Sequence, residues 1–375
     1  MKKVVIAIDS FKGCLPSAEA GKAAAEGIRS VYPECEVICL PIADGGEGML
    51  DVLIMATNGQ EVPISAHDPL MRWRNTYYGI SENGETAFIE MASISGLPLV
   101  PPERRNPMLT TTYGTGEIIR DALERGCRNF IIGIGGSATN DAGLGMLQAL
   151  GFRFSDKEGK EVGTGRGEVL IKVAHIDSTF VHPALNSCRF TVACDVQNPF
   201  YGPEGAAYVF APQKGADREM VEALDAGLQN FAEVIRHTTG KDISHHPGAG
   251  AAGGMGGSLL AFLNAELKPG IQLMLEALDF SNKIKSADLI ITGEGKADRQ
   301  TLMGKVPSGI LAEARKQNIP VILLAGNIED SDELQQAGFE GVFSVNPPFI
   351  SLEEAMRPEV ARKNIQQTVE SICKK

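Results

Sequence analysis

Residues Val4 to Ile8 read VVIAI, and Asp9 to Gly13 follow with DSFKG. The first run is continuously apolar and mostly β-branched, which is typical of a strand buried on both faces of a parallel sheet. Asp9 ends this run, and apolar residues then recur at helical spacing from Pro16 until Pro33 closes the segment. The first part of the chain therefore predicts a β-α unit of a parallel sheet.

The same alternation continues beyond this unit and returns at the far end of the chain. Val37 to Ile42 predicts a second strand, and Glu47 to Ala56 predicts a second helix. The far end predicts a strand, a helix, a strand and a final helix: Leu289 to Ile291, about Ser308 to Lys316, Val321 to Leu324, and a helix carrying Ala361, Ile365, Val369 and Ile372. Both chain ends thus predict one parallel sheet flanked by helices.

The middle of the chain breaks the alternation. Glu61 to Ser65, Arg72 to Ile80 and Thr86 to Met91 predict three short strands with no helix between them, and Asn83-Gly84 is a hairpin signal. Strands and helices then alternate up to a long amphipathic helix, Arg218 to Arg236. We therefore expect an α/β protein of two domains, with a parallel domain formed by residues 1–60 and 286–375 and an inserted mixed α/β domain at 61–285.

The composition limits the classes of function. The chain has 375 residues, 43% of them hydrophobic, and a net charge of −12. This length suits two domains, because single cores stop growing beyond about 250 to 300 residues. The acidic balance disfavours nucleic acid or an anionic membrane as the main partner.

The cysteines and the N-terminus indicate where the protein acts. Seven cysteines with no C-x-x-C motif predict reduced, mostly buried thiols. Asp9 ends the first apolar run too early for a signal peptide, and the uncharged stretch from Pro247 to Ala265 contains too much glycine for a membrane helix. We expect a cytoplasmic protein.

Five glycine-rich clusters stand out. Most of them follow a predicted strand or precede a predicted helix, which is where α/β sheets bind ligands. Small residues there allow backbone N–H groups to converge on an anion such as phosphate or carboxylate. The clusters are DSFKG from Asp9, ADGGEG from Ala43, GIGGSATNDAG from Gly133, GAGAAGGMGG from Gly248 and GEGKADRQT from Gly293.

The third cluster has two interpretations. Gly135 and Gly136 form a tight turn after a strand, and Ser137, Thr139 and Asn140 place hydroxyl and amide groups where a helix begins. These residues suit an anion site, but they are equally the preferred caps of a helix.

Familiar nucleotide motifs are absent. Gly248-x-Gly250-x-x-Gly253 matches the dinucleotide pattern, but a polar segment precedes it in place of the required strand. No G-x-x-x-x-G-K-[ST], H-R-D or D-F-G motif occurs, so a kinase here would be of another type.

Carboxylates and lysines accompany the glycines. Phosphoryl transfer requires amides that hold an anion, a divalent metal on oxygen ligands, a cation near the moving phosphate and a base. Residues in or near the clusters supply these groups: the acids are Asp9, Asp44, Glu47, Asp141, Asp195, Glu294 and Asp298, and the candidate cations are Lys12, Lys214, Lys296 and Lys305.

Several of these motifs, in this order, resemble the glycerate kinase type 1 family over nearly the whole chain. The further matching pieces are HDPL from His67, CDVQNPFYGPEGAA from Cys194, FAPQKGA from Phe210 and ITGEGKADRQTLMGKVPSG from Ile291. The resemblance implies ATP-dependent phosphorylation of D-glycerate, usually to 2-phosphoglycerate and less often to 3-phosphoglycerate. It also implies a Rossmann-like and a flavodoxin-like domain with the site in the cleft between them. Ala142 and Lys296 depart from the family pattern, which has glycine and arginine there.

Candidate roles follow from the clusters and the resemblance together. Asp195 is the first choice for the base that accepts the hydroxyl proton, and Asp44 is the second; Asp195 could instead be a turn residue that bonds its own backbone. Lys12 is a candidate catalytic cation. Substrate or phosphate binding is expected from Ser10, Gly45, Gly46, Gly135, Gly136, Ser137, Thr139, Asn140, Gly253, Gly254 and Lys296, and the candidate Mg²⁺ ligands are Asp141, Glu294 and Asp298.

Two other classes of function remain open at this point. A hydroxy-acid dehydrogenase would share the sheet, but it needs the strand-GxGxxG-helix unit that is missing. A non-enzymatic two-domain binding protein for a small organic anion would fit the discontinuous layout, but it would not need several acids beside glycine loops. The sequence does not say which loop holds ATP and which holds glycerate, and it makes no prediction of the oligomeric state.

Overall fold

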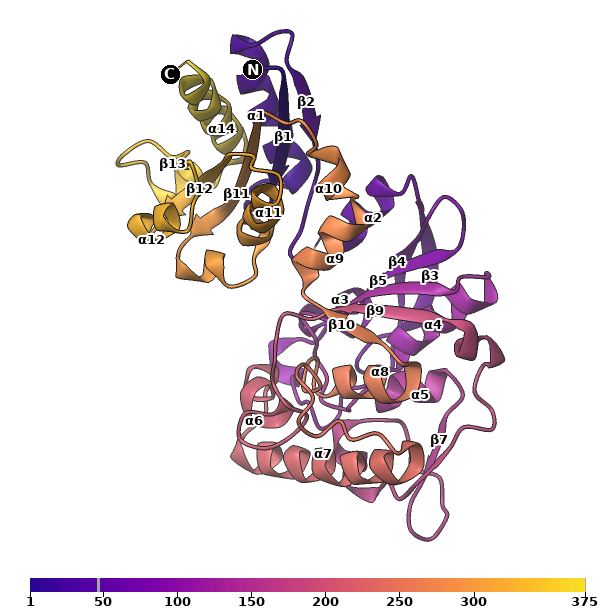
Figure 1. Cartoon of the computed structure of the whole chain (residues 1–375). Coiled ribbons are helices and arrows are strands. Elements are labelled where there is room, and N and C mark those ends of the chain that lie inside the picture. Colours follow the sequence, from indigo (N-terminus) through magenta and orange to yellow (C-terminus); the bar gives the residue numbers. More distant parts are fainter. Residues whose placement is uncertain (46–47, 375) are drawn as a thin grey trace. The chain divides into compact units, whose positions relative to one another are not determined.

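A computed structural model describes residues 1–45 and 48–374 and divides the chain into two units (Figure 1). The first unit comprises Met1–Asp44 and Ile271–Lys375, and the second comprises Gly45–Gly270. These divisions come earlier in the chain than the boundaries expected at 60/61 and 285/286.

Two helices account for the shift in the boundaries. Helix α2 (Met49–Ala56) packs on strands of the second unit, and the amide of Leu50 donates to Glu90 there (2.8 Å). At the other division, Ile271 lies against Gly309 of the first unit, so helix α9 (Gly270–Ala277) belongs with the first unit almost from its start.

The first unit contains a five-stranded sheet with the order β13-β12-β11-β1-β2. Every neighbouring pair is parallel, which confirms the parallel sheet predicted from both chain ends. The strands are β1 (Lys3–Ile8), β2 (Glu36–Cys39), β11 (Leu289–Ala297), β12 (Val321–Ile328) and β13 (Gly341–Ser344).

Strand β1 lies in the interior of this sheet. Residues Val4 to Ile8 are almost fully buried, as a continuous apolar run predicts, and they pair with Leu289 to Gly293 of β11. Strand β11 extends further than expected, through the GEGKA segment that the sequence analysis treated as a loop. It remains a strand because Glu294, Lys296 and Ala297 continue to pair with β12.

Helices flank the sheet of the first unit (Figure 1). Helix α1 follows β1 and packs against α14, the last helix of the chain. Apart from α9, the remaining helices of this unit lie between Phe280 and Ala355 in the sequence. Their bounds are α1 (Ser17–Val31), α10 (Phe280–Lys283), the 3-10 turn η6 (Arg299–Leu302), α11 (Val306–Arg315), α12 (Ser331–Gln336), α13 (Leu352–Ala355) and α14 (Pro358–Cys373).

The second unit is built on a mixed six-stranded sheet with the order β10-β9-β6-β5-β4-β3. Strands β3, β4 and β5 are consecutive and antiparallel, as the strand signals predicted, while β5, β6, β9 and β10 are parallel. A separate two-stranded sheet joins β7 to β8. The strands are β3 (Gln60–His67), β4 (Trp73–Ile80), β5 (Thr86–Glu90), β6 (Asn129–Gly133), β7 (Arg153–Ser155), β8 (His175–Asp177), β9 (Arg189–Ala193) and β10 (Glu266–Lys268).

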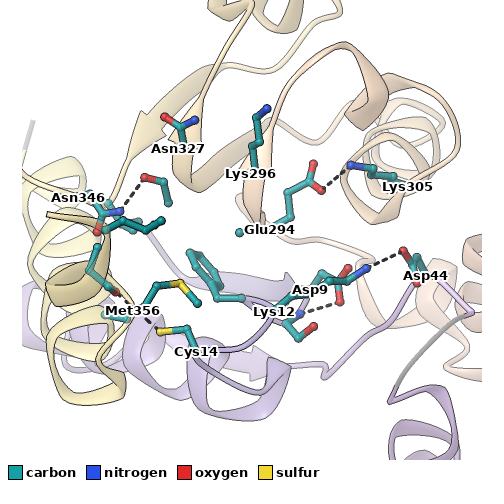
Figure 2. Close-up of a pocket in the computed structure, with 18 residues that line it drawn as sticks. Asp9, Lys12, Cys14, Asp44, Glu294, Lys296, Lys305, Asn327, Asn346 and Met356 are labelled. Carbon is teal, nitrogen blue, oxygen red and sulfur yellow. Dashed lines mark hydrogen bonds and ion pairs between the residues drawn. The ribbon is translucent and has the colours of Figure 1, made fainter. Parts of the chain in front are cut away.

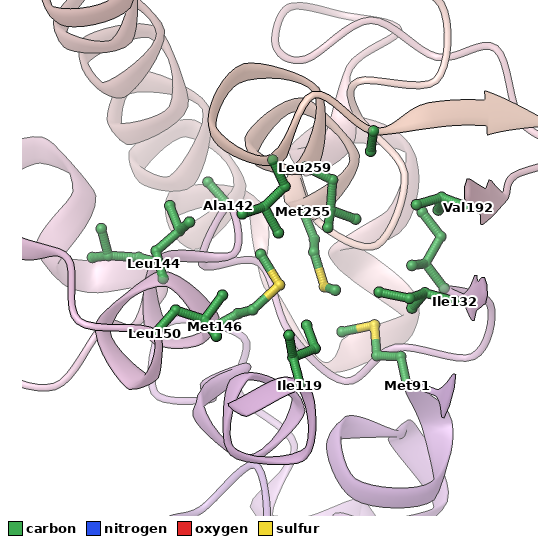
Figure 3. Packing of buried hydrophobic residues seen from close by; sticks show 14 of the residues in the cluster. Met91, Ile119, Ile132, Ala142, Leu144, Met146, Leu150, Val192, Met255 and Leu259 are labelled. Carbon is green, nitrogen blue, oxygen red and sulfur yellow. The ribbon is translucent and has the colours of Figure 1, made fainter. Parts of the chain in front are cut away.

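The helices of the second unit enclose a large apolar core. Figure 3 shows Met91, Met146 and Met255 packed with Ile119 and Ile132 in that core. In the described residues, no helix is long and apolar enough to cross a membrane. Besides α2, the α-helices are α3 (Ala92–Ser95), α4 (Tyr113–Glu124), α5 (Leu144–Ala149), α6 (Ala206–Phe210), α7 (Arg218–Thr239) and α8 (Met255–Leu263), and the 3-10 turns are η1 (Leu97–Leu99), η2 (Pro102–Arg104), η3 (Gly167–Lys172), η4 (Pro183–Ser187) and η5 (Pro212–Lys214).

The close approach of α1 to α14 gives a test of the first unit. A Cβ atom on Gly27 would lie 2.5 Å from the carbonyl oxygen of Gln366 and 3.0 Å from Val369, so Gly27→Ala should lower the free energy of unfolding by roughly 1 to 3 kcal/mol. Gly21→Ala in the same helix is the control. Its new Cβ would meet neighbours only at 3.8 Å or beyond, so it should raise stability by about 0.5 to 1 kcal/mol through helix propensity. Urea unfolding measures both variants, and equal effects would refute the packing argument.

Candidate active site

A cavity of about 320 Å³ opens in the first unit where the strands of its sheet end. The DSFKG loop after β1, the end of β11, the end of β12 and the segment after β13 all contribute to its lining. Its charged residues are Asp9, Lys12, Asp44, Glu294, Lys296 and Lys305. Figure 2 shows Asn346 and Met356 at one end of this cavity and Asp44 and Lys305 at the other. The carboxyl ends of parallel strands are the expected location of a ligand site in such a sheet.

Asp9 is the most perturbed acid in the cavity. It is buried, and one carboxylate oxygen accepts a hydrogen bond from the amide of Ser10 (2.6 Å). Burial raises the pKa of Asp9 to about 7, and the charges of Asp44 and Glu294 act in the same direction. A carboxyl group with a pKa near neutral pH is suited to accept a proton.

Glu294 lies on the part of β11 that was expected to be a loop. Its side chain accepts a hydrogen bond from the hydroxyl of Thr301 (2.6 Å), and its second oxygen lies 3.5 Å from the amine of Lys305. Burial raises the pKa of Glu294, although Thr301 and Lys305 act in the opposite direction. This buried acid faces the cavity together with a lysine that is only partly exposed.

The other charges of the cavity are more exposed. The Lys12 amine lies 3.8 Å from a carboxylate oxygen of Asp44. Lys296 forms ion pairs with Glu329 (2.9 Å) and Asp298 (3.5 Å). Asp298 also caps the η6 turn by accepting from the amide of Gln300 (2.8 Å).

A second polar cluster lies in the second unit, on the loop after β6. The amine of Lys214 donates to the Ser137 hydroxyl (2.8 Å) and to the Thr139 carbonyl (2.7 Å). Burial lowers the pKa of Lys214 to about 7, although Asp141 acts in the opposite direction. The Thr139 hydroxyl and the Asn140 amide are buried without a hydrogen-bond partner among the described residues. Buried polar groups without partners are rare, so this loop has unused capacity to bind a polar ligand.

Asp141 ends this loop, and its carboxylate already accepts four hydrogen bonds from the protein. It accepts from the amide and hydroxyl of Thr112 (both 2.8 Å) and from the amides of Gly143 (3.1 Å) and Gly145 (3.2 Å). Burial raises the pKa of Asp141 while these bonds act against that effect. Of the three predicted Mg²⁺ ligands, Asp141 is the one that the local geometry supports least.

The glycines of the second unit hold its loops close together. A Cβ atom on Gly253 would lie 2.1 Å from the carbonyl oxygen of Thr139, so this glycine lets two backbone segments approach, and one on Gly254 would lie 2.9 Å from the Leu228 side chain. Gly45 packs in the same way on Gly270 and Ala193, whereas Gly135 and Gly136 are exposed. Gly46, another predicted anion-binding residue, and Glu47 lie outside the described residues.

Asp195 is exposed immediately after β9, at the carboxyl edge of the second sheet. One of its carboxylate oxygens accepts from the amide of Gly270 (2.8 Å). An asparagine at this position would retain that bond, so the proposed base role can be tested separately from folding.

The predicted site residues thus form two groups. The cavity of the first unit brings together Ser10, Lys12, Asp44, Glu294 and Lys296. The loop after β6 and the segment around Gly253 form a second group within the other unit. No cluster of three or more histidine, cysteine, aspartate or glutamate side chains placed to hold a metal is found in residues 1–45 and 48–374.

Two lysines that the sequence predicted only as candidate cations have defined partners in the structure. Lys305 was only one of several candidate cations, and its pairing with Glu294 depends on the extended β11, which no local pattern predicts. Lys214 was likewise a candidate cation, and the apolar residues of its FAPQKGA motif are the sequence signal for its burial.

The family of the chain is decided by a whole-length match. The model of the glycerate kinase family matches residues 4–375. The chain belongs to the glycerate kinase family. The prediction from the motifs is therefore confirmed, and the chain is an enzyme of the phosphotransferase class. This finding removes support from the dehydrogenase and binding-protein alternatives.

Individual members of the glycerate kinase family are similar throughout. A glycerate kinase of Bacillus subtilis (strain 168) is 46% identical over 99% of this chain and 97% of its own length. A glycerate 2-kinase of Escherichia coli (strain K12) is 48% identical over 95% of this chain and 93% of its own. A crystal structure of a glycerate kinase 2 from Salmonella typhimurium LT2 matches with a TM-score of 0.91 and 44% identity, covering 100% of this chain and 97% of that one.

One departure from the glycerate kinase pattern has a structural cost. The expected glycine is replaced by Ala142, and its φ angle is +53°, in the left-handed region that favours glycine. The residue is held there because its amide donates to the Gly253 carbonyl (3.0 Å) and its carbonyl accepts from the Ser258 hydroxyl. Backbone strain of this kind persists only where the surrounding structure fixes it.

The raised pKa of Asp9 predicts how stability depends on pH. In the unfolded chain an aspartate ionises near pH 4, whereas the pKa of folded Asp9 is about 7, so the folded state binds more protons between these values. Stability contributed by this group is therefore lost as the pH rises from about 4 to about 7. Asp9→Asn, which removes the buried charge, should raise the free energy of unfolding by roughly 2 kcal/mol more at pH 8 than at pH 5.

Urea unfolding of the ligand-free protein in EDTA measures this difference. Asp332→Asn, on the exposed start of α12, should show no such dependence on pH. An Asp9→Asn effect equal at both pH values would mean that Asp9 is ionised throughout.

Proposed function

We propose that the protein transfers the terminal phosphoryl group of ATP to D-glycerate and that the product is 2-phosphoglycerate. Membership of the glycerate kinase family supports the substrate, and the relative named glycerate 2-kinase supports the position of transfer. The observation that carries the proposal is the cavity at the strand ends of the first unit, where lysines and buried acids line one space. The 3-phosphoglycerate isomer is the alternative product.

The residues of the cavity suit phosphoryl transfer. This chemistry needs little covalent help from a protein, and most of the rate comes from positioning and from stabilising negative charge. Lys12 and Lys305 form ion pairs with Asp44 and Glu294, respectively. Their amines are therefore placed at the cavity surface, where phosphate oxygens could accept from them.

The acids of the cavity fit a bound Mg²⁺ ion. Mg²⁺ in kinases usually takes one or two carboxylates and completes its shell with water and substrate phosphates, so no larger protein cluster is needed. The raised pKa values of Asp9 and Glu294 reflect burial of acids close together, a cost that a divalent cation would remove. We propose that Glu294 and Asp9 hold the ion, which neutralises phosphate charge. Asp298 lies next along this segment, but its carboxylate is engaged by the cap and by Lys296.

The loop after β6 is proposed to bind an anionic part of a substrate. Gly135 and Gly136 are exposed and belong to the same loop as the unpartnered groups of Thr139 and Asn140. Lys214 supports the loop from below through Ser137. An anion that accepted from the Asn140 amide would satisfy a buried group that lacks a partner.

The protein is proposed to act in the cytoplasm. All seven cysteines are free, and four of them are buried, as the sequence analysis predicted. Unpaired thiols in this number are typical of proteins in reducing compartments.

Turnover is the direct test of the proposed reaction. The protein incubated with ATP, Mg²⁺ and D-glycerate should form 2-phosphoglycerate, which phosphorus NMR distinguishes from 3-phosphoglycerate. EDTA should abolish the reaction, because the metal neutralises the phosphate charge. Undiminished activity in EDTA would refute the role of Mg²⁺, and a 3-phosphoglycerate signal would correct the regiochemistry.

The proposed base is tested by a second variant. Asp195→Asn keeps the shape and the bond from the Gly270 amide but removes the basicity, so kcat should fall roughly 100-fold with a modest change in KM for ATP. Asp44→Asn is the comparison, because Asp44 is the second candidate. If Asp195→Asn keeps near wild-type kcat and melting temperature while Asp44→Asn loses activity, the role belongs to Asp44.

A further inference from the structure

The cavity of the first unit has two chemically different ends. Its charged end contains the lysines and acids described above. Its other end is lined by apolar side chains from the DSFKG loop, the segment after β13 and helix α13: Phe11, Val345, Leu352, Ala355 and Met356. Figure 2 shows Met356 at the end of the cavity away from Asp44 and Lys305.

The apolar end is open to water. Phe11 and Val345 are buried beneath it, but Leu352 is 78% exposed and Met356 is 39% exposed. These two residues are four positions apart at α13, so their side chains lie on one face. Large apolar side chains that line a cavity yet remain exposed favour a ligand with an apolar surface of its own.

A polar group is fixed beside these apolar residues. The Asn346 side chain donates to the Gly326 carbonyl (2.8 Å) and accepts from the Asn364 amide (3.3 Å). A carboxamide has two N–H donors and two acceptor lone pairs, so each of these bonds leaves a second donor or acceptor position on the same group. A fixed amide of this kind can pair with the edge of a heterocyclic base.

Glycerate does not match the apolar end. Each of its three carbons carries oxygen, so it has no apolar face to cover Leu352 or Met356. A nucleotide joins a flat ring to a chain of phosphates through a sugar, and the cavity has an apolar end and a lysine-bearing end in the same arrangement. We propose that this cavity binds the adenine nucleotide, with the base against Leu352 and Met356 and the phosphates at Lys12 and Lys305.

This assignment rests on the proposed function for the identity of the nucleotide, and it names which part of the chain binds it. Isothermal titration calorimetry of the full chain with ADP and with inorganic tripolyphosphate, each with Mg²⁺, separates the two ends. The double variant Leu352→Ser/Met356→Ser should weaken ADP binding roughly tenfold and change tripolyphosphate binding less than twofold. Lys12→Met should weaken both ligands.

The matched control is Ile171→Ser, which exchanges another exposed aliphatic residue outside the cavity. It should leave both affinities unchanged, and melting temperatures check that every variant is folded. ADP affinity within twofold of wild type in the double variant, or an equal loss for tripolyphosphate, would overturn the proposal.

Kinetics distinguish failure of this assignment from failure of the proposed function. The double variant should raise KM for ATP and leave KM for D-glycerate within about twofold. A raised KM for D-glycerate alone would place the acid at the apolar end and overturn the assignment. The double variant could weaken ADP binding as expected while the wild-type protein phosphorylates no D-glycerate. That result would refute the proposed substrate and support the nucleotide site.

Discussion

The parallel pairing of β1 with β11 is the constraint on which the first unit depends. Val4 pairs with Leu289 and Ile8 with Gly293, so the two ends of the chain share one buried sheet. Because both strands run in the same direction, their carboxyl ends meet at one edge. That edge brings Asp9, which follows β1, into the same cavity as Glu294, which lies on β11 one residue beyond the last pair.

This arrangement concentrates acids at a cost in stability. The raised pKa values of Asp9 and Glu294 mean that the folded protein resists ionising them, and the extensive apolar core of the first unit offsets that cost. Lys214 in the second unit is a comparable case. Its amine is buried, which is unfavourable for a charged group, but it holds the loop after β6 through two hydrogen bonds. Groups that are unfavourable for folding and precisely held are typical of functional sites.

Much of this could be predicted from local sequence patterns. The apolar runs located β1 and β6, and the helical spacing located α1 and α7, because these signals come from burial of one strand or one helix face. The extension of β11 and the placement of α2 could not be predicted, since both depend on which distant strand lies alongside. The positive φ angle of Ala142 and the exposed face of Leu352 and Met356 also arise from tertiary packing. The roles given to Asp195, Asp44 and the glycine loops stay predictions.

The location of the nucleotide is the central claim of this account, and a crystal structure of the protein with ADP and Mg²⁺ tests it most directly. Electron density for the base is expected against Leu352 and Met356, with the phosphates near Lys12 and Lys305 and the metal near Glu294. A nucleotide bound instead on the loop from Gly135 to Asn140, with the cavity of the first unit empty, would contradict it.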